Sequence, residues 1–297
     1  MGFSPLIPTI SSINNMDYKE FDKFIRYGFA YVKIQGHGVE EALEKLSDEA
    51  LRFFRGPSEK KYQPGVVFDP RTIVGYIDRR GESPDNRLLL EQVFFRPEQP
   101  LSIFSECEKD IAIIRNAFWD AIGEPILLNI FYTILKKANF RTKKIHNLFN
   151  EAIKDIFSTL ALLYYPATNC PEKYDAGLNA HTDQGLITVL WINQESLQVW
   201  IEEAKEWHDL EPKKGFVIVN IGNALKIILG ELCTSAFHRV IIPKRERLSI
   251  GAFYDPARSY KMRDVIQNKL LFGGSTAEYL KDHFSKTSSY TFESIID

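Results

Sequence analysis

The sequence predicts a single domain of mixed α and β structure, in which a mainly helical region is followed by a β-rich core. Its 297 residues are 44% hydrophobic and 26% charged, which provides apolar side chains for one large core. The hydrophobic period is mainly helical up to residue 160 and then changes to short runs of β-branched and aromatic residues. No repeat or Pro/Gly/Ser linker separates the two parts, so we expect one domain over residues 1–297.

The first part alternates between strand-like and helix-like patterns. Phe21, Phe24 and Ile25 have helical spacing and are followed by Gly28, a residue that often ends helices. A proline in the first strand restricts that strand to an edge. The expected elements of this part are an edge strand at 7–10, a helix at 18–27, a strand at 29–34, a helix at 40–54, an irregular loop region at 64–87, and helices over 103–163 with a kink or break at Pro125.

The β-rich core is expected over residues 161–256, where apolar runs of strand length are separated by turns. We expect strands at 186–192, 197–201, 216–221, 240–242 and 248–254. Residues 257–297 are expected to form a helical tail.

Charge and cysteine content exclude several classes of protein. The net charge of −2 includes no concentrated basic tract, so we expect no nucleic-acid partner. The longest apolar region, residues 111–135, is interrupted by charges and by Pro125, so no membrane span is expected. Three widely spaced cysteines and an N-terminus without an export or lipid-anchor signal suggest a cytoplasmic protein. We expect a monomer, although the sequence does not determine the oligomeric state.

A group of polar residues lies at the edges of the expected strands. His181-Thr182-Asp183 comes directly before one apolar run, and His238 follows His181 by 57 residues at the start of another. The only Arg-x-Ser triplet of the chain, Arg247-Leu248-Ser249, begins nine residues after His238. The order and spacing of these residues are more specific than the His-x-Asp triplet alone.

These residue types can form a catalytic metal site. Two neutral imidazoles and one carboxylate on the same side of a metal suit iron(II) or a similar ion and leave coordination positions open. Residues 181 and 183 point to the same side of an extended segment, and His238 would come from a neighbouring strand. The guanidinium of Arg247 could bind a carboxylate with two hydrogen bonds, and the Ser249 hydroxyl could add a third. The pattern therefore indicates a metal site beside a pocket for an acidic co-substrate.

The same pattern resembles that of the 2-oxoglutarate/iron(II)-dependent dioxygenases, in particular their isopenicillin N synthase-like branch. The resemblance extends with gaps over residues 5–256. It includes the segments Gly28-Phe29-Ala30-Tyr31-Val32, Gly36-His37-Gly38, Gly75-Tyr76, Tyr164-Tyr165-Pro166, Val219-Asn220-Ile221-Gly222 and Phe237-His238-Arg239-Val240. Two positions depart from the family pattern, because Leu163 stands where plant members often have Asn and Asn223 stands where Asp is usual. We expect a structural role for position 223.

The resemblance implies a distorted double-stranded β-helix, or jelly roll, flanked by helices. His181, Asp183 and His238 would bind Fe(II), and Arg247, Ser249 and Tyr165 would bind the co-substrate 2-oxoglutarate. Oxygen, the second co-substrate, would oxidise a C–H bond of a small organic molecule by hydroxylation, desaturation or ring closure, with release of succinate and CO2. The residues expected to contact that molecule are Arg79, Arg80, Tyr76 and Phe253.

Two alternatives remain open from the sequence. Isopenicillin N synthase-type oxidases share the metal ligands and the Arg-x-Ser triplet but do not use 2-oxoglutarate. The last glutamine of this chain is Gln267, far from the position near the C-terminus where isopenicillin N synthase has one, which favours the dioxygenase. A non-enzymatic binding protein is disfavoured, since a binder does not need open metal positions. The identity of the substrate does not follow from the sequence.

Overall fold

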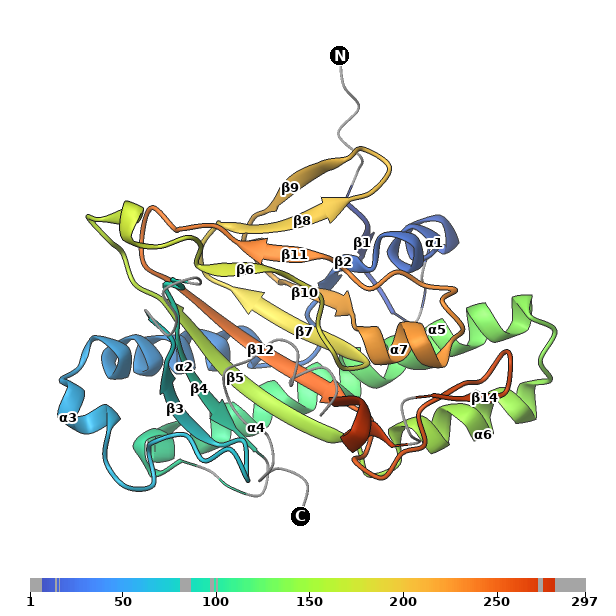
Figure 1. Cartoon of the computed structure of the whole chain (residues 1–297), viewed down its shortest axis with the longest axis horizontal. Coiled ribbons are helices and arrows are strands. Elements are labelled where there is room, and N and C mark those ends of the chain that lie inside the picture. The colour runs from blue at the N-terminus through green and yellow to red at the C-terminus, as the bar shows by residue number, and fades with distance from the viewer. Residues whose placement is uncertain are drawn as a thin grey trace.

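Two β-sheets face each other, and helices cover the outer face of the larger sheet (Figure 1). The computed structural model describes residues 7–13, 15, 17–80, 87–96, 99, 101–271 and 275–280. The architecture is the double-stranded β-helix with flanking helices that the sequence pattern implied. No helix in the described ranges is long and apolar enough to cross a membrane.

The larger sheet is mostly antiparallel and has the strand order β1-β2-β10-β7-β12-β5-β4-β3. Its strands are β1 (Thr9–Ile10), β2 (Phe29–Lys33), β3 (Gly75–Asp78), β4 (Glu91–Phe95), β5 (Phe157–Tyr165), β7 (Ile187–Ile192), β10 (Phe216–Ile221) and β12 (Arg247–Asp255). Only β1 pairs in parallel, with β2 at the edge of the sheet.

The smaller sheet has the order β6-β11-β8-β9 and closes over the inner face of the larger one. Its strands are β6 (Leu178–His181), β8 (Leu197–Ile201), β9 (Glu206–Leu210) and β11 (His238–Val240). Leu197 and Val199 from this sheet share a buried cluster with Leu190 and Leu163 from the larger sheet. This inner core lies between the two sheets.

A second and larger core lies between the larger sheet and the helices. The helices are α1 (Tyr18–Tyr27), α2 (Val39–Arg55), α3 (Ser58–Lys61), α4 (Glu108–Asn116), α5 (Glu124–Lys137), α6 (Thr142–Ile153) and α7 (Asn223–Ile228), with a π-helical turn at Ala117–Gly123 between α4 and α5. Side chains of β12 alternate between the two cores, because successive residues of a strand point to opposite faces. Leu248 and Ile250 pack towards the helices, whereas Phe253 packs in the inner core.

Several elements agree with the sequence analysis. The first helix has the expected bounds and ends at Gly28, whose φ of 81° is easily adopted by glycine and whose N–H donates to the Phe24 carbonyl. The strands at 197–201 and 216–221 also have the expected bounds. Pro125 lies in the first turn of α5, directly after the π-helical turn, and Gly123 and Glu124 keep helical φ and ψ angles, so the chain is irregular near Pro125 but the helix is not broken there.

Several expectations for elements were wrong in part, among them the strand expected at 240–242, which lies at His238–Val240 as β11. The helical region does not extend to residue 163, because Phe157–Tyr165 forms β5 in the centre of the larger sheet. This strand is buried on both faces, so its continuous apolar run lacks the alternation that separates strands from helices. Within the expected loop at 64–87, residues Gly75–Asp78 form β3, and residues 81–86 lie outside the described ranges.

The expected helical tail at 257–297 is also different where it is described. Residues Arg263–Asp264 and Lys269–Leu270 pair as the hairpin β13–β14. The Asp264 carboxylate accepts hydrogen bonds from the backbone N–H groups of Ile266 and Gln267, which stabilises a turn in competition with a helix. Residues 276–280 do form a helical turn, and residues 281–297 lie outside the described ranges.

Candidate metal centre and co-substrate pocket

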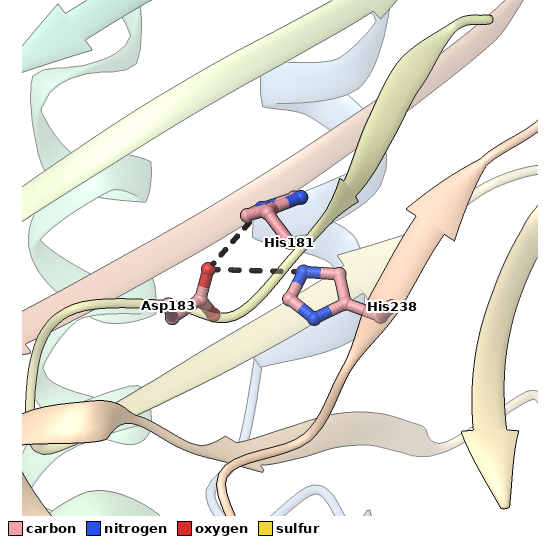
Figure 2. A group of neighbouring side chains, drawn as sticks. All are labelled: His181, Asp183 and His238. Carbon is pink, nitrogen blue, oxygen red and sulfur yellow. Dashed lines mark ion pairs between the residues drawn. The ribbon is translucent and has the colours of Figure 1, made fainter. Parts of the chain in front are cut away.

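The pairing of β6 with β11 brings the three expected metal ligands together. His181 ends β6 and is the direct partner of His238, which begins β11. Asp183 lies in the following turn, which leads into β7 of the larger sheet. The Asp183 Oδ1 atom is 3.6 Å from His181 Nε2 and 3.7 Å from His238 Nε2, and these distances are drawn in Figure 2. One ligand atom of each residue lies within 4.8 Å of the others, a spacing that a single metal ion can bridge.

Contacts around the three residues orient their ligand atoms towards a common point. The Nδ1 atoms of His181 and His238 lie 2.8 Å and 3.0 Å from the carbonyl oxygens of Asn179 and Ala236. Nδ1 therefore carries the proton in each ring, and the lone pair of Nε2 is left for a metal. Thr188 Oγ1 donates to Asp183 Oδ2 at 2.5 Å, so the other carboxylate oxygen faces the two rings.

The electrostatic environment favours the ligating form of Asp183. Burial alone would raise the pKa of Asp183, but the charges of His238 and His181 and the hydrogen bond from Thr188 lower it well below its usual range. Burial and the nearby charge of His181 lower the pKa of His238, which favours its neutral form. Burial also lowers the pKa of His181, but the hydrogen bond and charge of Asp183 raise it more. Acid therefore competes with a metal first at His181.

Buried polar side chains lie together on the inner face of β12, on the side of the sheet that faces the candidate metal centre. Arg247 and Ser249 are 1% and 0% exposed, and both belong to this face by strand alternation. All three guanidinium nitrogens of Arg247 and the Ser249 hydroxyl lack a hydrogen-bond partner among the described residues. Isolated burial of a charge costs several kcal/mol in a typical protein, so these side chains are suited to a ligand that supplies an anion. A carboxylate matches the donor arrangement of a guanidinium and a hydroxyl.

Tyr165 lies beside the Arg247 guanidinium. It ends β5 and is the direct partner of Arg247 on β12, and the guanidinium carbon lies 4.9 Å from the centre of the phenol ring. Burial raises the pKa of Tyr165 although the charge of Arg247 acts in the opposite direction, so the phenol stays neutral and can donate a hydrogen bond. Tyr165, Arg247 and Ser249 therefore lie together, in the arrangement expected from the sequence.

Two of the four expected substrate contacts lie on the metal side of the larger sheet. Phe253 is the direct partner of Thr188, whose hydroxyl holds Asp183, and its ring packs in the inner core. Arg79 follows β3 on the face opposite to Arg80, and its charge opposes protonation of His181.

The other two expected contacts, Tyr76 and Arg80, lie on the helix-covered face of the sheet. Tyr76 Oη donates to Glu91 Oε2 at 2.6 Å, and Arg80 forms ion pairs with Asp78 at 2.6 Å and with Glu91 at 3.1 Å. Lys61 Nζ is 2.7 Å from the same Glu91 carboxylate. Alternation along β3 explains the difference, since Tyr76, Asp78 and Arg80 share the face that points away from the metal centre. Tyr76 therefore belongs to a buried cluster with Lys61 and Glu91, which the exposed Arg80 joins from its edge, and a substrate contact of Tyr76 or Arg80 stays a prediction.

Thr188 and two glycines near the metal centre were not recognised from the sequence. Thr188 is a polar residue inside the apolar run of β7, five residues after Asp183, and that position was a usable signal. A Cβ atom at Gly222 would lie 2.2 Å from the Gly185 carbonyl oxygen, and a Cβ at Gly185 would lie 2.6 Å from Tyr254 O. Because glycine has no Cβ atom, the turn after Asp183 can pack this closely against the ends of β10 and β12.

Comparisons with known proteins agree with this geometry. Residues 156–256 match the model of the 2OG-Fe(II) oxygenase superfamily. Jasmonate-induced oxygenase 2 of Arabidopsis thaliana is 28% identical over 77% of this chain and 62% of its own length. Jasmonate-induced oxygenase 1 of the same plant is 27% identical over 88% of this chain and 65% of its own length. The chain thus spans less than two thirds of these relatives.

Solved structures show the same fold. A full-length Neurospora crassa protein in complex with alpha-KG and 5-formyluracil superposes with a TM-score of 0.72 at 21% identity and covers 97% of this chain and 98% of its own. JOX2 in complex with 2OG, Fe and JA has a TM-score of 0.70 at 24% identity and covers 98% of this chain and 88% of its own. The β-rich core at residues 156–256 thus resembles the 2OG-Fe(II) oxygenase superfamily, and the chain as a whole shares the fold of these solved structures. The cofactors of this superfamily, iron(II) and 2-oxoglutarate, fit the donor sets of the metal centre and of Arg247 and Ser249.

Proposed function

We propose that this protein is an Fe(II)- and 2-oxoglutarate-dependent dioxygenase that oxidises a C–H bond of a small organic molecule and releases succinate and CO2. The observation that carries the proposal is the buried pair of Arg247 and Ser249, whose donors lack partners in the described part of the chain and lie beside a His-Asp-His centre. A metal centre alone would not require a buried, uncompensated guanidinium. A dicarboxylate that reaches from the metal to Arg247 accounts for both features.

The residues of the chain have separate tasks in this reaction. His181, Asp183 and His238 would hold Fe(II), which when bound supplies the oxygen chemistry of the family. Arg247 and Ser249 would bind the remote carboxylate of 2-oxoglutarate, with Tyr165 as a neutral donor beside Arg247. The carbonyls of Asn179 and Ala236 keep the proton of each histidine on Nδ1. Phe253 and Arg79, on the metal side of the sheet, are the residues proposed to orient the substrate.

A small-molecule substrate is part of the proposal. The neighbours crystallised with 5-formyluracil and with JA bind compounds of this size. The net charge of −2 gives no support for a nucleic-acid partner. The three cysteines are all free, which suits a reducing cytoplasm, and we propose a monomer.

Anaerobic titration tests the proposal directly. The protein loaded with Fe(II) is titrated with 2-oxoglutarate, and a metal-to-ligand charge-transfer band is expected in the visible spectrum. Arg247→Ala should require much more 2-oxoglutarate for the same band, whereas Arg245→Ala, a change at an exposed arginine two residues away, should not. Absence of the band in the unmodified protein would favour the oxidase that works without 2-oxoglutarate.

A further inference from the structure

The turn that carries Asp183 is held by side chains from two distant parts of the chain. Residues 182–185 connect β6 to β7 and define the position of Asp183 between the two histidines. Gln184 Nε2 donates to the Thr182 carbonyl at 2.9 Å, which closes the turn on itself. The amide oxygen of Gln184 consequently points away from this contact and is available as an acceptor.

Asn223, the first residue of α7, binds both sides of this turn. Its Nδ2 donates to Thr182 Oγ1 at 2.8 Å and lies 3.2 Å from Gln184 Oε1. Its backbone N–H donates to the Asp183 carbonyl at 2.8 Å. Asn223 therefore contacts the residue before the metal ligand, the ligand itself and the residue after it.

Tyr279 reaches the same amide from the other end of the chain. Its Oη lies 2.8 Å from Gln184 Oε1 and 3.3 Å from the Gln184 carbonyl, and the residue is 5% exposed. Backbone bonds from Thr276 to Tyr260 and from Ala277 to Arg258 fix the short segment 275–280 that carries Tyr279. Burial and then the charge of Asp255 raise the pKa of Tyr279, so its phenol is a donor.

We propose that Asn223 and Tyr279 are positioning residues that act through Gln184 to hold Asp183 for metal binding. The segment 275–280 lies outside the region matched to the family model, and through Tyr279 it contributes one of the contacts that hold the turn of Asp183. The inference rests on the proposed function only in taking His181, Asp183 and His238 as metal ligands. The amide of Asn223 matters here, because an aspartate at this position could accept a hydrogen bond from the Thr182 hydroxyl but could not donate to Gln184 Oε1.

The test compares metal affinity in isosteric variants of the full chain. Asn223→Asp removes the Nδ2 donor, and Tyr279→Phe removes the hydroxyl. Titration with Co(II), followed by its visible absorption, should show the dissociation constant raised about tenfold in each variant, as is common when groups that orient metal ligands are removed. The double variant should lose less than the product of the two effects, because both residues act on one amide oxygen.

Tyr260→Phe is the matched control, since it removes a hydroxyl from another buried tyrosine of the C-terminal region. Its metal affinity should equal that of the unmodified protein. Co(II) affinities within twofold of the unmodified protein in folded Asn223→Asp and Tyr279→Phe would overturn the inference, as would an equal loss in Tyr260→Phe. Thermal melting confirms folding, and if Asn223→Asp does not fold, the comparison of Tyr279→Phe with Tyr260→Phe decides.

The two proposals fail separately. If the unmodified iron protein gives the 2-oxoglutarate charge-transfer band but the variants bind metal normally, the positioning role is wrong and the proposed function stands. If the band is absent but the variants lose Co(II) affinity, the positioning role stands and the oxidase alternative replaces the proposed function.

Discussion

At the scale of single residues, the site consists of polar groups buried at some cost to stability. Arg247 is fully enclosed, and burial lowers the pKa of its guanidinium although Tyr165 acts to raise it. Asp255, at the other end of the same strand, is a carboxyl group near Asp183. Both residues point to the inner face of β12 by alternation. Their charges are tolerable when a ligand or a proton compensates them.

Arg247→Met should separate stability from co-substrate binding. Removal of an uncompensated buried charge with retention of side-chain volume should leave the melting temperature of the ligand-free protein unchanged or higher. The variant should also lose hydrogen bonds to the carboxylate, about 1.5–3 kcal/mol for bonds of this kind, so the 2-oxoglutarate concentration for half-saturation should rise more than about tenfold. Melting curves with and without 2-oxoglutarate measure both effects. A large stability loss without ligand would show that Arg247 has an internal structural partner.

Asp255 should make the metal-free protein less stable as the pH rises from about 4 to 7. Burial, and then the charge of Asp183, raise the pKa of Asp255 to about 7. The folded state therefore binds a proton more tightly than the unfolded state, and this contribution to stability is lost as the pH rises through the folded pKa. In Asp255→Asn, the free energy of unfolding measured in urea with chelator present should depend less on pH across this range. An unchanged pH profile would contradict this assignment.

At the scale of elements, the predictable features are those with an unambiguous local signal. The helix at 18–27 has apolar residues at helical spacing, and Gly28 directly follows its last residue. These two local features were enough to predict where the helix lies and where it ends. The grouping of the three candidate metal ligands was predictable because His181, Asp183 and His238 follow a fixed order along the chain. The strand β5 was missed because Leu160–Leu163 is apolar on both faces, and only tertiary burial decides its conformation.

The contacts between elements were the least predictable part of the site. Tyr76 and Arg80 were themselves expected to contact substrate, but the face to which they point depends on the pairing of β3 with β4. Tyr279 lies 95 residues after Gln184, and no local pattern indicates their hydrogen bond. Such long-range contacts depend on how the sheets and the C-terminal segment pack.

Gly222→Ala should displace the turn that carries Asp183. Gly222 has a φ of −97°, which alanine also adopts, so the effect of the substitution is steric. The added Cβ would lie 2.2 Å from the Gly185 carbonyl oxygen and force this turn to move. We expect a stability loss on the order of 1–3 kcal/mol, together with weaker Co(II) binding.

Gly65→Ala is a suitable control for this substitution. Gly65 has a φ of 79° and no heavy atom within 4 Å of an added Cβ. Its replacement should cost about 1–2 kcal/mol through backbone strain but leave Co(II) affinity unchanged. Equal Co(II) affinity in Gly222→Ala and Gly65→Ala would contradict the steric argument.

At the scale of the whole molecule, the metal centre joins two sheets that share the inner core, whereas the second core lies between the larger sheet and the helices. His181 and His238 belong to the smaller sheet, whereas Asp183 lies in the turn that leads into the larger one. The helices pack on the opposite face of the larger sheet, in a core that contains none of the three ligands. A bound metal therefore links the smaller sheet to the rest of the molecule, and its effect on local stability should differ between regions.

Removal of the metal should loosen the smaller sheet while the helices remain folded. A metal stabilises the folded state in proportion to its binding free energy, and the elements that supply its ligands gain the most protection from local opening. In hydrogen exchange with and without chelator, β6, β11 and the 182–185 turn should exchange faster after metal removal, whereas α5 and α6 should be unchanged. His181→Ala should reproduce the exchange pattern of the chelated protein even with metal present. Uniform acceleration throughout the chain would instead show that the two cores unfold as one unit.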